Sequence, residues 1–260
     1  MRLSANLSFL FPELALPDRI DAAARAGFEG VEIIAPYEVP AKALRARLDA
    51  TGVRQVLINS YAGDWDRGER GLACLPGREQ DFRDAVRLSL DYAGALGCNL
   101  VHLMAGIPPA EVSRDRAMAL FAVNLDWAAG QATAAGVRLA IEAINQRDIP
   151  GYLLRTQEQA AALAATAGAD RVGLQFDIYH CQTAQGDVTR RLEALFPLIA
   201  HIQVADVPGR HEPGTGEIGW DFLLGRIRAL GYDGWIGCEY RPSGDTVAGL
   251  AWLGRYGLRT

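Results

Sequence analysis

The chain has 260 residues, a length that matches one eight-stranded β/α barrel and can bury roughly three quarters of its unfolded surface. We therefore expect one domain, residues 1–260, that needs neither a disulfide nor a structural metal to hold its core. The 26 basic and 31 acidic residues give a net charge of −5, and no run of Lys or Arg could follow a phosphate backbone. This balance argues against nucleic acid as a partner.

The cysteines and the apolar segments point to the cytoplasm. Cys74, Cys98, Cys181 and Cys238 lie far apart and form no CxxC pair, which argues against a disulfide framework and a thiolate zinc site. The opening MRLSANLSFLF lacks the features of a secretory signal, and no stretch approaches the ~18 apolar residues of a membrane span. We expect a cytoplasmic protein that does not associate with membranes.

Short β-type runs alternate with longer helical patterns along the chain, which predicts parallel strands joined by helices. We predict eight strands, near residues 3–8, 30–34, 53–59, 99–104, 137–142, 172–177, 200–205 and 234–239. Between them we predict helices that include Leu16–Ala26, Ala41–Ala50, Glu79–Leu96, Asp115–Ala135 and Thr156–Ala167. Glycines that can end a helix precede several strands: Gly27, Gly52, Gly97, Gly136 and Gly231.

Eight βα units favour a closed (β/α)8 TIM barrel over an open doubly wound sheet, which typically has five or six strands. No Pro/Gly-rich linker divides the chain. One irregular stretch, Ser60–Arg78, is unusually long, and loops of this length in compact domains often bind ligands or act as lids.

Carboxylates end three of the predicted strands, at Glu142, Asp177 and Glu239. In a barrel the carboxyl ends of the strands form the active-site face. A single carboxylate at such a position is more often a helix cap or a surface group. Three of them, each after an apolar run, would form a costly cluster of like charges unless a cation neutralised it. Oxygen ligands of this kind suit Mg²⁺ or Mn²⁺ better than zinc.

Three further polar residues lie beside these carboxylates. His180 follows Asp177 by three positions, and the seventh strand supplies Gln203 and Asp206. The amide oxygen of Gln203 can join a set of oxygen ligands, although an amide in an apolar strand can also form a hydrogen bond with a neighbouring group. His180 can likewise be a packed histidine.

The glycines Gly214, Gly216 and Gly219 spell GxGxxG, the pattern of a dinucleotide-binding turn. That pattern must follow a strand directly, whereas a stretch with Pro208 and Pro213 intervenes here. We therefore do not predict a nucleotide site.

Several segments together resemble the hydroxypyruvate isomerases, which are xylose isomerase-like barrels. The matching segments are SANLSFLF, GFEGVE, AGDWDRGERGLACLPGRE, IEAIN, DIPGY, QFDIYH, HIQVAD, HEPGTGEI and GWIGCEY, spread over nearly the whole chain. The segment VHLMAG in the fourth strand is more similar to the related 2-oxo-tetronate isomerases, so both activities stay open. A barrel alone implies neither, because this fold carries many chemistries.

The resemblance implies specific roles. Glu142 and Glu239 would be the paired acid and base, and both would bind a divalent metal, Mg²⁺ or Mn²⁺, together with Asp177 and Gln203. The substrate contacts implied are His180 and Arg210. Arg70 is a further candidate, because a guanidinium suits a substrate carboxylate.

The reaction expected is the interconversion of hydroxypyruvate and tartronate semialdehyde, which moves one hydrogen between adjacent carbons. Two carboxylates can transfer that proton while a cation stabilises the enediol. The expected partner is thus a small hydroxy-carbonyl acid, and a homo-oligomer is compatible with the sequence. Alternatives are a ketose 3-epimerase, a zinc phosphodiesterase like endonuclease IV and a non-catalytic binder of sugar acids. The few histidines and the negative charge argue against the phosphodiesterase.

Overall fold

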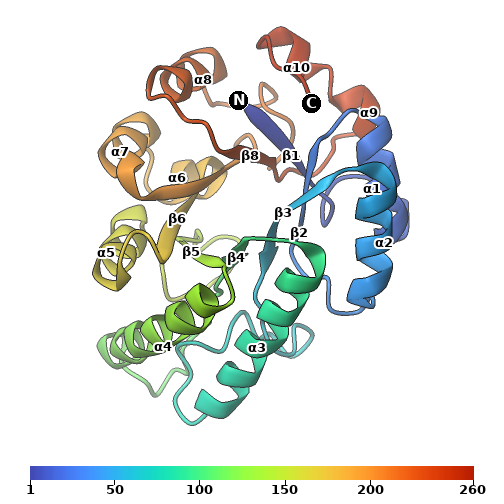
Figure 1. Cartoon of the computed structure of the whole chain (residues 1–260). Coiled ribbons are helices and arrows are strands. Elements are labelled where there is room, and N and C mark those ends of the chain that lie inside the picture. Colours follow the sequence, from blue (N-terminus) through green and yellow to red (C-terminus); the bar gives the residue numbers. More distant parts are fainter.

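The computed structural model describes residues 1–260 as a closed barrel of parallel strands in the order β1 to β8 (Figure 1). The strands are β1 (Arg2–Asn6), β2 (Gly30–Ile33), β3 (Arg54–Asn59), β4 (Leu100–His102), β5 (Arg138–Glu142), β6 (Val172–Asp177), β7 (Ile199–Val204) and β8 (Trp235–Cys238). Pairing of β1 with β8, with Leu3 opposite Ile236, closes the barrel. The predicted TIM barrel is confirmed.

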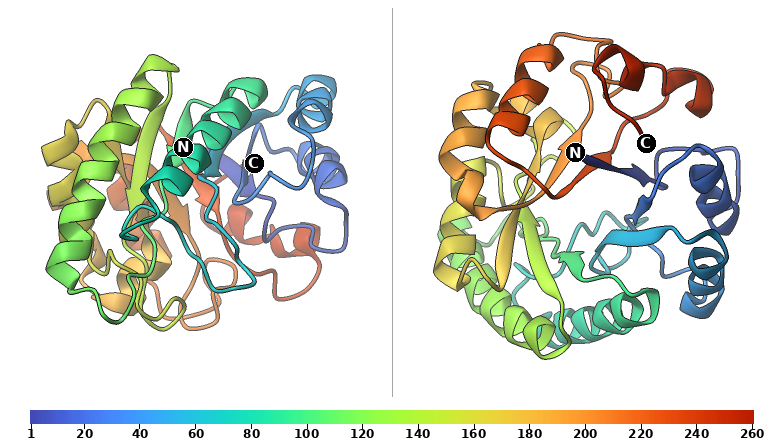
Figure 2. Two further views of the ribbon diagram at one scale, coloured as in Figure 1. Left: turned by 90° about the horizontal axis from the view of Figure 1, so that it is seen from below. Right: turned by 45° about the horizontal axis from the view of Figure 1, so that its top comes forward.

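Helices form a ring outside the strands (Figures 1 and 2). They are α1 (Leu16–Arg25), α2 (Ala41–Thr51), α3 (Glu79–Leu96), α4 (Arg114–Ala134), α5 (Gln157–Ala167), α6 (Ile178–Ala184), α7 (Val188–Leu195), the 3-10 turn η1 (Phe196–Leu198), α8 (Trp220–Ala229), α9 (Thr246–Gly249) and α10 (Trp252–Arg255). The five predicted helices are present. The glycines expected to end helices all have positive φ, a conformation that glycine adopts without a steric penalty.

Two strands, β1 and β4, end two residues earlier than predicted because the backbone groups at their ends form other hydrogen bonds. β1 ends at Asn6, whose carbonyl accepts hydrogen bonds from the backbone N–H groups of Phe9 and Leu10 in a turn. β4 ends at His102, beyond which the N–H of Met104 donates to the Ser60 hydroxyl at 3.1 Å. At both places the polypeptide therefore leaves the sheet earlier than the apolar pattern of the sequence suggests.

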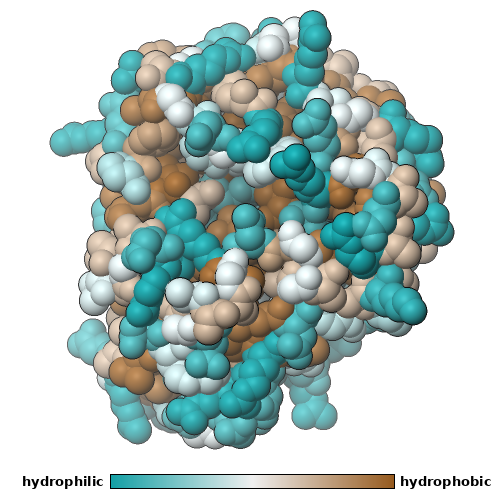
Figure 3. Space-filling view, in the orientation of Figure 1, coloured by the Kyte–Doolittle hydropathy of each residue, from teal (hydrophilic) through white to brown (hydrophobic).

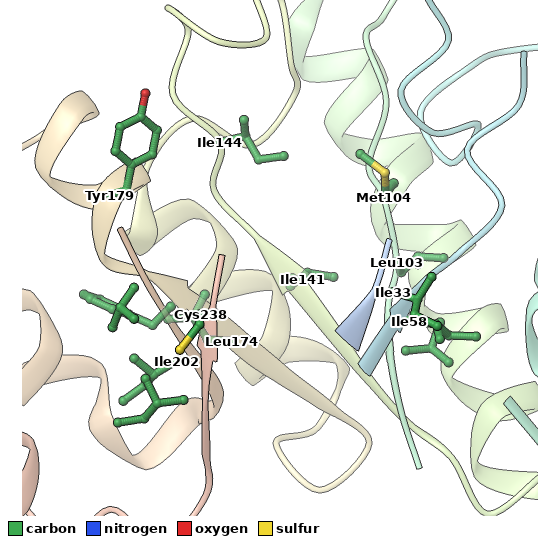
Figure 4. Packing of buried hydrophobic residues seen from close by; sticks show 14 of the residues in the cluster. Ile33, Ile58, Leu103, Met104, Ile141, Ile144, Leu174, Tyr179, Ile202 and Cys238 are labelled. Atoms are coloured by element: carbon green, nitrogen blue, oxygen red, sulfur yellow. The ribbon is translucent and has the colours of Figure 1, made fainter. Parts of the chain in front are cut away.

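Alternation along the strands separates an apolar layer from a polar one. Ile33, Ile58, Ile141, Leu174 and Ile202 belong to the main apolar cluster, which also contains the buried side of the helices (Figure 4). The residues between them in the strands are polar and nearly all fully buried: Ser4, Asn6, Glu32, His102, Glu142, Gln175, Asp177, His201, Gln203 and Glu239, the last just after β8. The barrel interior is therefore polar toward the carboxyl ends of its strands.

The remaining features agree with a barrel that needs no covalent support. All four cysteines are buried and unpaired, as the sequence predicts.

None of the helices combines the length and apolarity that crossing a bilayer requires. The face in Figure 3 mixes hydrophilic side chains with neutral and hydrophobic areas. Both termini lie at the same end of the barrel, where Met1 and Thr260 line one cavity (Figure 2).

Candidate active site

Three carboxylates meet at the carboxyl ends of the strands, where the sequence predicts them. Glu142 ends β5, Asp177 ends β6 and Glu239 follows β8, and their residues are only 4, 1 and 7 % exposed. The Nε2 atom of His180 lies 3.9 Å from both Glu142 Oε1 and Asp177 Oδ2. Asp177 also caps α6, since its Oδ1 accepts the His180 backbone N–H at 2.8 Å. The cap fixes His180 above the carboxylates.

Arg210 extends into this carboxylate cluster from the loop after β7. Its Nη2 lies 2.5 Å from Glu239 Oε1 and 3.6 Å from Asp177 Oδ2. The guanidinium carbon also lies 5.0 Å from the ring centroid of Phe9 and 4.9 Å from that of Tyr179. The backbone φ of Arg210 is +56°, a value that few side-chain-bearing residues adopt. The predicted substrate contact is thus adjacent to the predicted acid–base pair.

Burial changes the protonation of this cluster. It raises the pKa of Glu142 well above its usual value, and the nearby charges of Asp177 and Glu239 raise it further. Burial also raises the pKa of Asp177 to about 6 and that of Glu239 to about 8, although Arg210 opposes both shifts. The metal-free site therefore holds protons near neutral pH.

Two oxygen atoms of the cluster have no hydrogen-bond partner. They are Glu142 Oε1 and Asp177 Oδ2, both buried. Together with His180, ligand atoms of these two residues lie within 4.8 Å of one another. A buried unpaired carboxylate oxygen is costly, so this arrangement fits a bound divalent cation.

Gln203 contacts the cluster through its nitrogen. Its Nε2 donates to Glu239 Oε2 at 2.6 Å, and its Oε1 accepts from Gln175 Nε2 at 2.7 Å. For Gln203 to act as a metal ligand, as the sequence predicts, its amide would have to rotate so that the oxygen replaces the nitrogen.

Glu32, in the middle of β2, is a site residue that sequence reasoning missed. Its carboxylate is fully buried and lies 2.9 Å from His201 Nε2 and 2.9 Å from Gln203 Nε2. Ser4 donates to it at 2.5 Å. Burial alone would raise its pKa, but the charge and hydrogen bond of His201 and the bonds of Ser4 and Gln203 lower it overall. Glu32 therefore stays ionised beneath the cluster and fixes the amide of Gln203.

Glu32 fits only because residue 237 is glycine. A Cβ atom on Gly237 would lie 2.2 Å from Glu32 Oε1. We expect Gly237→Ala to lower the free energy of unfolding by about 1–3 kcal/mol, the usual cost of overpacking a buried site. Urea unfolding, monitored by circular dichroism, measures this free energy. Gly94→Ala is the control, because Gly94 is helical with open space around it and alanine there should slightly stabilise the fold. A Gly237→Ala protein as stable as the parent would contradict this packing.

Asp206 lies outside the cluster and organises the loop that carries the GxGxxG pattern. Its Oδ2 accepts the backbone N–H groups of Gly214 at 2.8 Å and Gly216 at 2.9 Å, and the indole N–H of Trp220 at 2.9 Å. A Cβ on Gly216 would meet the Val207 carbonyl oxygen at 1.9 Å. These glycines therefore wrap a carboxylate of the protein itself, which agrees with the prediction that they form no nucleotide site.

Arg70 does not reach the cluster. Its guanidinium lies 3.6 Å from the ring centroid of Trp65, and its Nη1 donates to the carbonyl oxygens of Trp65 and Glu69. These contacts keep Arg70 within the 60–78 loop, because the aromatic face and the two carbonyls satisfy it locally. The structure thus gives no support to a role for Arg70 in binding the substrate carboxylate.

The 60–78 loop instead helps to form a cavity of about 490 Å³ near the carboxyl ends of β2 to β4. The lining includes Tyr37, Asn59, Tyr61, Trp65 and Met104. Trp65 is 48 % exposed, so an apolar ring is presented to solvent at this rim. The loop therefore lines an open cavity next to the barrel mouth.

Comparison with known proteins agrees with the barrel fold. The model of the xylose isomerase-like TIM barrel family matches residues 20–256. The chain is 51% identical to a 2-oxo-tetronate isomerase from Cupriavidus necator, with 98% of each chain covered. It is 42% identical to a hydroxypyruvate isomerase from Escherichia coli, covering 98% of this chain and 99% of that one. A crystal structure described as an AP endonuclease of family 2 from Brucella melitensis superposes with a TM-score of 0.95 at 40% identity, covering 100% of this chain and 99% of that one. The named isomerases among these full-length relatives support an isomerase function. On this evidence the chain belongs to the xylose isomerase-like TIM barrel family.

Proposed function

We propose that this protein isomerises a small hydroxy-carbonyl acid by metal-assisted proton transfer between Glu142 and Glu239. The observation that carries the proposal is the buried cluster of these two glutamates with Asp177, in which two carboxylate oxygens lack partners and Arg210 lies alongside. Hydroxypyruvate is the substrate implied by the sequence motifs. The relative with 51% identity supports a 2-oxo-tetronate as a second candidate substrate. Like hydroxypyruvate, a 2-oxo-tetronate has an oxo carbon next to its carboxylate and a hydroxyl group on the following carbon.

The residues present fit a hard divalent cation, Mg²⁺ or Mn²⁺. Glu142, Asp177 and Glu239 would hold it through oxygen atoms. Gln203, the fourth ligand that the resemblance implies, would join them only if its amide rotated and gave up its hydrogen bonds with Glu32 and Gln175. When bound, the cation would polarise the substrate carbonyl and offset the negative charge of the enediolate.

The two glutamates would move the proton. One carboxylate takes a proton from carbon 3 of hydroxypyruvate, and the other delivers a proton to carbon 2, while the hydroxyl proton passes from one oxygen to the other. The product is tartronate semialdehyde, with the same atoms as the substrate. A raised pKa suits this role, because an acid–base group works best when its pKa lies near the working pH. In the metal-free site burial raises the pKa of Glu239 to about 8, and a bound cation would lower it.

Arg210 would bind the substrate carboxylate. Its Nε is buried and has no hydrogen-bond partner, so one donor of the guanidinium remains available next to the cluster. Asp148 Oδ2, at 3.4 Å from Nη1, helps to hold the guanidinium in this orientation.

We expect Arg210→Ala to lower kcat/KM for an acid substrate by the equivalent of ~1–3 kcal/mol, the usual effect of losing a charged hydrogen bond. Part of the loss should appear in kcat, because Arg210 also pairs with Glu239. Steady-state kinetics with hydroxypyruvate and with dihydroxyacetone, which lacks the carboxylate, measures the difference. Arg226→Ala is the matched control, because Arg226 on α8 pairs with Glu193 and does not contact the carboxylate cluster. Equal losses with both substrates would remove Arg210 from this role.

A phosphodiesterase acting on nucleic acid has less support in the site itself. Two histidines lie beside Glu142, His180 at 3.9 Å and His102 at 3.6 Å, whereas clustered zinc needs more nitrogen ligands than these two. The net charge of −5 also opposes binding of a polyanion. A non-catalytic binder of sugar acids would share the fold and the site but would show no turnover.

A substrate panel tests the proposal. Hydroxypyruvate, 2-oxo-tetronates and ketohexoses are assayed with Mg²⁺ and with Mn²⁺, and the rate of isomer formation is measured for each. We expect turnover of at least one of the short acids and little of the ketohexoses. Binding without turnover would favour the non-catalytic binder, and preference for a ketohexose would favour a ketose epimerase.

A further inference from the structure

The orientation of the Asn145 amide can be deduced from its hydrogen bonds. Asn145 is buried and follows Glu142 by three residues. Its Oδ1 accepts the backbone N–H of Arg147 at 3.0 Å and that of Asp148 at 2.9 Å. Two N–H donors require an acceptor, so the oxygen of this amide must face the turn. The amide nitrogen therefore faces the other way, toward His180.

This orientation determines where His180 carries its proton. Asn145 Nδ2 lies 2.7 Å from His180 Nδ1, and an amide NH₂ group can only donate. The backbone N–H of Asn145 points at the same ring nitrogen, at 3.4 Å. Nδ1 must then be an unprotonated acceptor. An imidazole with one bare ring nitrogen is neutral and carries its single proton on the other nitrogen, so the proton of His180 is on Nε2.

The protonated Nε2 faces the carboxylate cluster. It lies 3.9 Å from Glu142 Oε1 and from Asp177 Oδ2, too far for a hydrogen bond to either. The N–H group therefore lacks a partner in the protein and is available to a ligand oxygen. A nitrogen that carries a proton also has no lone pair for a cation.

We propose that Asn145 is a positioning residue that fixes His180 as an Nε2–H donor to a substrate oxygen, and that His180 is not a metal ligand. The identity of the acceptor rests on the proposed function, whereas the tautomer does not. A neutral imidazole can polarise a carbonyl and stabilise the oxyanion that forms from it. The cation site would then consist of oxygen ligands alone, although His180 lies within reach of it.

The tautomer can be measured directly in the full-length protein labelled with ¹⁵N-histidine. Two-bond ¹H–¹⁵N spectra distinguish a protonated ring nitrogen from a bare one, and a His180→Gln variant assigns the signals among the four histidines. We expect a bare Nδ1 and a protonated Nε2 in His180, unchanged when Mg²⁺ is added. A protonated Nδ1, or a loss of the Nε2 proton on adding Mg²⁺, would overturn the inference.

Asn145→Asp then tests the positioning role. The aspartate keeps an oxygen for the N–H groups of Arg147 and Asp148, so the turn can form, but its second oxygen demands a proton on Nδ1. We expect the ¹⁵N signature of His180 to change and kcat to fall by about 10–100-fold, as is typical for residues that orient a functional group, with a smaller change in KM. Gln146→Glu is the control, because it makes the same amide-to-acid change one residue further on without contacting His180.

Parent-like kcat in Asn145→Asp, together with a changed tautomer, would overturn the donor role. If instead the parent protein turned over none of the short acids, the proposed function would fail. The proposal that His180 donates to a substrate oxygen would then fail as well. The ¹⁵N spectrum of the parent protein would still show which ring nitrogen of His180 carries the proton.

Discussion

Replacing Glu142 or Glu239 with glutamine is expected to lower kcat by at least the ~10²–10⁴-fold typical of lost general acid–base catalysis. Glutamine keeps the size of the side chain and an oxygen that can bind a cation, but near neutral pH it can neither accept nor donate a proton as a carboxyl group does. Both glutamates should be separately essential, because proton removal and proton delivery need two groups. Steady-state kinetics, with metal content measured in parallel, gives the result.

Glu212→Gln is the matched control for both variants. Glu212 is a buried glutamate outside the cluster, and its carboxylate accepts hydrogen bonds from the backbone N–H of Ser243. Glutamine can still accept there, so turnover should stay close to that of the parent. Full turnover by either Glu142→Gln or Glu239→Gln with metal still bound would refute the two-carboxylate mechanism.

Removing the metal with a chelator is expected to abolish turnover while leaving the secondary structure intact. The proposed ligands lie at the ends of strands in a barrel whose apolar core extends between strands and helices, so folding does not depend on them. Activity and far-ultraviolet circular dichroism are measured on the same samples. Mg²⁺ or Mn²⁺ should restore the activity.

Metal affinity should also depend on pH. Burial raises the pKa of Asp177 to about 6 and that of Glu239 to about 8, so the metal-free site retains protons that a cation must displace. Affinity for Mg²⁺ should therefore decrease as the pH falls from about 8 to 6, which calorimetric titration can follow. Unfolding on chelation would assign the metal a structural role, and reactivation by zinc alone would refute the oxygen-ligand argument.

The barrel and the outline of the site follow from local patterns in the sequence. Alternating apolar runs and helical periods give the strand order, and parallel strands bring their carboxyl ends to one face. Glu142, Asp177 and Glu239 end or directly follow their strands, so their proximity could be predicted without knowing any distance. Arg210 was predicted only from the family resemblance, because no local pattern marks it.

Glu32 and Asn145 show why the rest could not be predicted. Glu32 is placed by contacts with His201 and Gln203, about 170 residues further along the chain, and the strand around it shows only one polar residue between two apolar ones. The importance of Asn145 depends on which atom of its amide faces His180, which is a property of the folded turn. Arg70 was proposed as a substrate contact because of its charge; in this structure it contacts Trp65 next to it, and its role stays a prediction.

The most direct test of the central claim is proton NMR of hydroxypyruvate incubated with the Mg²⁺-loaded protein in deuterium oxide. Proton transfer through a carboxylate allows exchange with solvent, so we expect tartronate semialdehyde that carries deuterium at carbon 2 in at least part of the product. Samples without protein and with Glu142→Gln correct for spontaneous exchange. The same measurement applies to a 2-oxo-tetronate. Product formed with no deuterium on that carbon would indicate a direct hydride shift, and no isomer from either acid would contradict the proposed function itself.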